Sequence, residues 1–132
     1  MLSRFIKRTG VEKVKIGFAC RFEEILFKLG EKELSFSCSI GSELVIYTRT
    51  GVCWRGSIIP LDTSERINII KQVIIWARKK CNKIVLKVDL GDRDKDEILK
   101  LMENEEVSNV KIRIEYEDLL NSDILRNPFK EK

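Results

Sequence analysis

The chain has 132 residues, with 25 basic and 21 acidic side chains and a formal net charge of +4 at pH 7. That length fits one domain with a sizeable core. No apolar run approaches the ~20 residues that a membrane span requires. The basic arm at residues 1–10 lacks the apolar segment of a secretory signal. We therefore expect a cytoplasmic protein without a membrane partner.

The chain has no histidine, and its four cysteines form no Cys-x-x-Cys pair. Zinc sites usually combine closely spaced cysteines or histidines, so we predict neither a metal nor a cofactor. The cysteines are expected to be buried thiols. A disulfide between neighbouring strands stays open, because abundant isoleucine, lysine and glutamate with a single glutamine is typical of heat-adapted proteins. The four are Cys20, Cys38, Cys53 and Cys81.

The first half of the chain predicts an antiparallel sheet. Apolar and polar side chains alternate in several stretches, most strictly in 33–40, which is the signature of a strand with one buried face. Gly41 and Ser42 predict a hairpin turn, and Pro60 ends the last strand. The predicted strands are residues 13–20, 33–40, 43–49 and 52–59.

The segment 22–29 fits two structures. Its apolar residues match a short helix closed by Gly30, and the same residues match a continued strand. We favour the helix, because Glu23 and Glu24 suit a first helical turn.

The chain is organised around a long helix, residues 63–81, which leads into a strand at residues 84–90. Asp62 is a good N-cap, and Glu65 stands in the capping-box position three residues later. The strand is short, rich in β-branched residues and nearly all apolar, which indicates burial on both faces. We therefore expect this strand to be central in the sheet.

The apolar surface of that helix is wider than one sheet-facing stripe. A second apolar row, made of Ile69, Val73 and Trp76, runs beside the first. We therefore predict that this row forms an interface, either between two copies of the chain in a homodimer or with a partner protein.

The last third begins with an acidic loop at residues 92–96. A helix at 94–104 and an alternating strand at 110–116 follow, and a strand–helix–strand unit of this length predicts a parallel crossover. Residues 121–132 are polar and predict a tail.

Together these elements predict a single α+β domain spanning residues 1–132. Its mixed sheet has an antiparallel N-terminal meander and a parallel C-terminal βαβ unit, and the 63–81 helix packs on it.

Charge is distributed unevenly: residues 1–50 carry +3, residues 51–87 carry +6 and residues 88–132 carry −5. A basic middle predicts contact with RNA or DNA phosphates. Trp54 is available for base stacking. The alternatives are that the basic middle pairs with the acidic end, that the cations complement the helix dipole, and that the tryptophan belongs to the core. The candidate nucleic-acid-binding residues are Arg55, Arg78, Lys79, Lys80 and Lys83.

The acidic loop partly matches a calcium-binding loop. Asp92, Asp94 and Asp96 fall at ligand positions, but Glu97 stands where glycine is required. Helix capping is the favoured interpretation. A divalent-metal enzyme using Asp89 with this cluster is the alternative, since ligands gather at the carboxyl ends of strands.

The run from Ser39 to Tyr47, the long helix and the following strand together resemble the nuclease domain of archaeal tRNA-splicing endonucleases over residues 22–90. The resemblance implies that Tyr47 matches the family's catalytic tyrosine, and Lys79 or Lys80 its lysine. The family's histidine has no counterpart in this chain. The resemblance therefore implies a non-catalytic form with no catalytic residues.

Three functions follow as hypotheses. The leading one is a non-enzymatic interaction protein or complex subunit on a nuclease-like scaffold that contacts nucleic acid. The second is a self-assembling structural protein of a virus or mobile element. The third is the metal enzyme.

Overall fold

The structure, a computed structural model, describes residues 13–104, 107 and 111–117. The predicted basic arm and polar tail lie outside these residues. In chain order its elements are β2 (Val14–Ala19), β3 (Glu24–Leu29), β4 (Lys32–Ile40), β5 (Leu44–Tyr47), the 3₁₀ turn η1 (Thr48–Thr50), α1 (Thr63–Ala77), β6 (Lys83–Asp89), α2 (Lys95–Lys100), the 3₁₀ turn η2 (Leu101–Glu103) and β7 (Lys111–Glu117).

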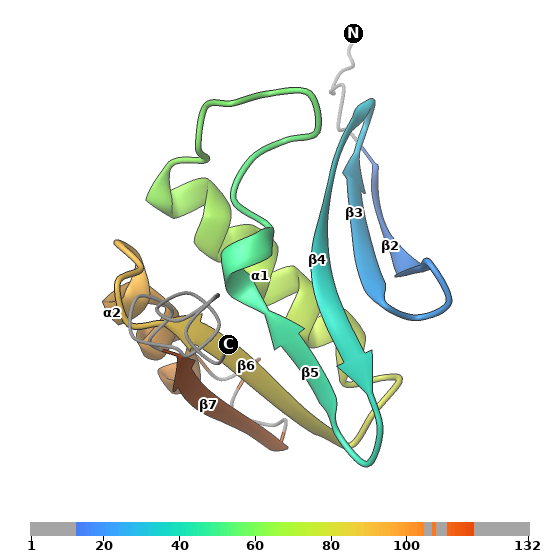
Figure 1. Cartoon of the computed structure of the whole chain (residues 1–132), viewed down its shortest axis with the longest axis vertical. Helices are drawn as coiled ribbons and strands as arrows, with labels where there is room; N and C mark the ends of the chain where they lie inside the picture. The colour runs from blue at the N-terminus through green and yellow to red at the C-terminus, as the bar shows by residue number, and fades with distance from the viewer. Residues whose placement is uncertain (1–12, 105–106, 108–110, 118–132) are drawn as a thin grey trace, which may run out of the picture.

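Six strands form one sheet in the order β2-β3-β4-β5-β6-β7 (Figure 1). The first four are antiparallel neighbours, while β6 runs parallel to both β5 and β7. The α1 helix connects β5 to β6, and α2 lies between β6 and β7. This confirms the predicted single α+β domain with a mixed sheet.

The core lies between the sheet and its two helices, which share one face. Ile46 of β5, Ile74 of α1 and Ile98 of α2 are all buried in the same apolar cluster. Because side chains alternate along a strand, Val45 and Tyr47 face the other way. We call that other side the open face, since neither α1 nor α2 covers it in the described part of the chain. Its central strands carry Ser35, Ser37, Ser39, Tyr47 and Lys87.

The start of α1 follows the predicted cap. The Asp62 carboxylate accepts a hydrogen bond from the Glu65 backbone amide at 2.8 Å. The helix ends at Ala77, four residues before the predicted end. Among the described residues, no helix is long and apolar enough to cross a membrane.

The prediction of a strand at residues 52–59 was wrong. The β5 strand pairs with β4 on one side and with β6 on the other, so no free edge is left for a third antiparallel strand. Residues 51–62 instead form an irregular connection, in which Ile58 and Ile59 are 94% and 74% exposed.

The preference for a helix at residues 22–29 was also wrong, because this segment contains strand β3. Ile25 and Phe27 are buried on the core face while Leu26 points the other way, and the strand is paired on both edges. The two long-range pairings outweigh the local preference of two glutamates for a helix start.

The connection after η1 depends on Gly51. A Cβ atom at this position would lie well inside the van der Waals distance of the Phe36 ring, and Phe36 is completely buried. We predict that Gly51→Ala lowers the free energy of unfolding by about 1–3 kcal/mol, because a filled core cannot accept the extra methyl group without strain. Chemical denaturation measures the difference.

The matched control is Gly17→Ala on β2, where an added Cβ meets no atom within 4 Å. Equal stability of the two variants would contradict the steric explanation.

Candidate nucleic-acid interface and the buried charge network

The basic segment predicted from the sequence lies in the turn between α1 and β6. The amides of Lys79 and Lys80 donate to the carbonyls of Trp76 and Ala77, at 3.2 and 2.8 Å. These bonds close the helix with its cations just beyond the last turn. We define the basic turn as residues 78–83, and its four cations, Arg78, Lys79, Lys80 and Lys83, are exposed.

Arg55 does not belong to this cluster. Its guanidinium pairs with Glu33 at the beginning of β4. The basic turn lies at the other end of β4. There the end of β4 pairs with the start of β5, which in turn pairs with Ile84, the residue after Lys83. Arg55 and the basic turn are therefore at opposite ends of β4. Grouping Arg55 with the other four cations was wrong.

Trp54 lies with Arg55, away from the basic turn. Its ring is tilted against Phe27 at 6.3 Å, with the Lys32 ammonium 5.0 Å from the ring centre. The half-buried Trp54 packs against the core, as the alternative interpretation of this residue had it.

The aromatic residue beside the basic turn is Trp76. The Lys80 ammonium lies 5.8 Å from its ring centre, and Phe18 of β2 meets the ring edge-to-face at 4.9 Å. Phe22, in the β2–β3 turn, continues the row at 5.2 Å from Phe18. We call Trp76, Phe18 and Phe22 the aromatic row. No sequence pattern predicts the aromatic row, because the three residues come together only when the β2–β3 hairpin contacts α1.

Of the three residues of the candidate interface row, two lie in the core and the third, Trp76, is partly exposed. Ile69 and Val73 are 3% and 2% exposed and belong to the core. Trp76 is half-buried beside them. The wide apolar face of α1 is thus largely covered within one chain, because the curled sheet and α2 both contact it.

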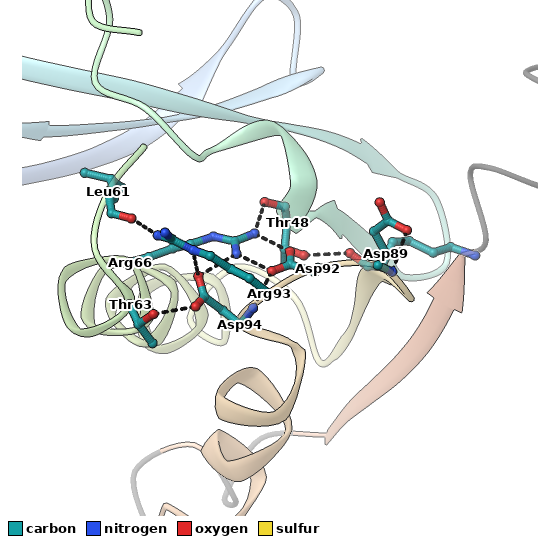
Figure 2. Close-up of polar contacts among 10 residues, drawn as sticks. Thr48, Leu61, Thr63, Arg66, Asp89, Asp92, Arg93 and Asp94 are labelled. Carbon is teal, nitrogen blue, oxygen red and sulfur yellow. Dashed lines mark hydrogen bonds and ion pairs between the residues drawn. The ribbon is translucent and has the colours of Figure 1, made fainter. Parts of the chain in front are cut away.

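The acidic loop forms a buried ion network with Arg66 of α1 (Figure 2). Arg66 is 2% exposed. Its two terminal nitrogens donate to the two oxygens of Asp92 at 2.6 and 2.7 Å, and one of them also donates to Asp94 at 2.9 Å. The other donates to the Thr48 carbonyl at 3.1 Å. One guanidinium thereby ties together α1, the β6–α2 loop and η1.

Further partners complete the network around Asp94. The Thr63 hydroxyl donates to Asp94 at 2.5 Å, and the Arg93 guanidinium donates at 3.2 Å. Arg93 also donates to the Leu61 carbonyl. The Asp94 amide donates to Asp92 at 2.8 Å. Asp94 is the N-cap residue of α2, but its side chain makes no capping hydrogen bond, so the favoured capping interpretation is not realised by this residue.

These contacts set the ionisation of both carboxyls. Burial opposes the charged form of Asp92, but the hydrogen bonds from Arg66 outweigh it and hold the pKa of this carboxyl below its usual range. Burial likewise opposes ionisation of Asp94, and bonds from Thr63, Arg66 and Arg93 lower its pKa. Both carboxylates therefore stay charged and paired at neutral pH.

This geometry leaves few oxygens for a divalent cation. Asp92 and Asp94 serve Arg66, Asp89 accepts from the Gly91 amide at 3.1 Å, and Asp96 is exposed in the first turn of α2. In the part of the chain that the structure describes, no three acidic or cysteine side chains converge as metal ligands.

The catalytic pair implied by the endonuclease resemblance is not assembled. Tyr47 lies on the open face, with Arg49 5.4 Å from its ring centre. Lys79 and Lys80 lie beside Trp76, on the face that α1 covers. The sheet separates the tyrosine from both lysines.

All four cysteines are free thiols, so the alternative of a disulfide is not realised. Cys38 is buried, which raises its pKa to about 11. Cys20 is exposed, contrary to the expectation of burial, because it lies in the turn after β2.

Comparisons with protein-family models, with curated proteins and with solved structures found no match.

We predict that Arg66→Met lowers the free energy of unfolding by about 3–5 kcal/mol at pH 7, because it leaves Asp92 buried without a cation and Asp94 with Arg93 alone. Urea denaturation followed by circular dichroism measures the loss.

The matched control is Arg113→Met. Arg113 also binds two carboxylates, Glu43 and Glu115, but its side chain is 54% exposed. Its replacement should cost much less, since water screens surface pairs. A loss of the same size for both variants would show that burial is not what matters.

The network also predicts a pH dependence. Carboxyls with a lowered folded pKa add stability that is present above about pH 3.9 and lost as the pH falls through the lower folded value. In Arg66→Met, Asp92 loses its cation and burial should raise its pKa, while Asp94 keeps its bonds from Thr63 and Arg93, so protonation of Asp92 relieves the variant. The stability difference between wild type and Arg66→Met should therefore shrink from about pH 7 to pH 3. A difference that stays constant would contradict the assignment.

Proposed function

We propose that the protein is a non-enzymatic nucleic-acid-binding protein that contacts phosphates through the basic turn. The carrying observation is four exposed cations within six residues, of which Lys79 and Lys83 form no ion pair with another described residue. Clustered and unpaired cations release condensed counterions when they meet a phosphate backbone, and this supplies most of non-specific affinity.

Dipole complementarity explains only part of this cluster. The helix dipole acts within the last turn, and α1 ends at Ala77. Lys83 begins β6, six residues further on. A phosphate-binding surface explains why cations such as Lys83 also occur beyond the end of the helix.

The non-enzymatic part of the proposal is supported by the same geometry. The acidic residues at the carboxyl end of β6 are hydrogen-bonded to Arg66 and Arg93. The chain contains no histidine to act as a general base. A non-catalytic subunit on a nuclease-like scaffold is compatible with both observations.

We predict that Lys79→Ala combined with Lys80→Ala weakens binding to RNA and DNA. It should also reduce the slope of log affinity against log salt by about 1.4 to 1.8, which corresponds to two lost phosphate contacts. Filter binding between about 50 and 200 mM salt measures both effects.

The matched control is Lys13→Ala combined with Lys28→Ala, which removes the same charge at the other end of the sheet. Equal losses for the two pairs would mean that only net charge matters. No binding of the wild type at low salt would refute the proposal.

A second candidate, a self-assembling structural protein, is favoured by two neighbouring and highly exposed isoleucines, Ile58 and Ile59. Adjacent apolar side chains at the surface suit a contact between proteins. A stable oligomer in sedimentation equilibrium that binds neither polymer would support this candidate instead.

A further inference from the structure

We infer that the bound polymer is a single strand whose bases stack on the aromatic row, with Phe22 as the outermost contact. This inference rests on the proposed function and deepens it. The row begins at the basic turn, where Lys80 lies over Trp76, and reaches the β2–β3 turn through Phe18. Phosphate-binding cations and base-binding rings are therefore adjacent on one surface.

Phe22 is the ring available to a ligand. It is 58% exposed, whereas Trp76 and Phe18 are half-buried. Arg21 beside it adds a further cation. Phe22 and Arg21 also line a pocket of about 580 Å³ with Glu23 from the same turn and with Cys38, Ser39 and Ile40 from the end of β4. The pocket thus offers an apolar wall for a base and polar groups for the edge of that base, while the Glu23 carboxylate disfavours a phosphate inside it.

The turn that carries Phe22 is held in an unusual conformation. Cys20, Arg21 and Phe22 have φ values of 51°, 58° and 71°, in the left-handed region that costs about 1–2 kcal/mol per residue without glycine. The Phe22 amide donates to the Ala19 carbonyl at 3.0 Å, and the Cys38 thiol donates to the Phe22 carbonyl at 3.4 Å. The ring is thereby presented from a fixed backbone, so little conformational entropy is lost on binding.

A duplex cannot use this surface in the same way. Its bases are stacked on each other, while a single strand exposes base faces to aromatic side chains. The cations serve both polymers equally, because phosphate contact does not require exposed bases. A preference for single-stranded over duplex nucleic acid is therefore the property that depends on the aromatic row.

The test is fluorescence anisotropy with a labelled single strand and with its blunt duplex of equal length, in RNA and in DNA, using the whole chain. The wild type should bind the single strand more tightly. Phe22→Ala should weaken single-strand binding roughly 5- to 100-fold and leave duplex binding unchanged. Phe22→Tyr keeps a stacking ring and should retain the affinity.

The matched control is Tyr116→Ala, which removes an aromatic ring that is 44% exposed and lies on β7, opposite the carboxyl end of β6. It should change neither affinity. Equal wild-type affinity for the two polymers, or unchanged single-strand binding by Phe22→Ala, would overturn the inference while the proposed function stands. Failure to bind either polymer would overturn both.

Discussion

The arrangement of the whole molecule depends on the burial of one guanidinium. Removing an arginine from water costs several kcal/mol unless its donors are paired with good geometry. The two terminal nitrogens of Arg66 find those partners only when α1, the β6–α2 loop and η1 meet as they do, while its Nε has none among the described residues. Other packings of the same apolar faces would leave this charge unpaired. The ion network therefore selects one position for α1 on the sheet, where apolar contacts alone would accept several.

The position of α1 on the sheet determines where the basic turn lies. A rigid helix rises about 1.5 Å per residue, so Arg66 fixes the end of α1 at Ala77 from roughly 16 Å away. The fixed end places Trp76 against Phe18, although β2 is four strands away from β6 in the sheet. The aromatic row is thus a product of the fold as a whole, with the buried charge at one end of α1 and the binding residues at the other.

The sequence predicted the elements whose signal is local. The Asp62 cap, the alternation of 33–40 and the apolar run of 84–90 each specify their structure within a few residues. Residues 22–29 and 52–59 were misassigned because their outcome depends on which strand edges are free, and that is a property of the finished sheet. Arg66 did leave a signal, since it falls on the same helical stripe as Ile70 and Ala77. A lone arginine on a buried stripe indicates a buried carboxylate partner, which the acidic loop supplies.

The candidate site was harder to predict, because it depends on which charges find partners inside the chain. The acidic residues near the carboxyl ends of β6 and β7 pair locally: Asp92 and Asp94 with Arg66, and Glu115 with Lys87 and Arg113. None of these pairs includes a cation of the basic turn. The acidic last third nevertheless neutralises part of the basic middle, because Arg66 and Lys87 both belong to residues 51–87, as the alternative of pairing between the two regions expected. Within the described residues Lys79 and Lys83 form no ion pair, so their positive charge is available to attract a polyanion.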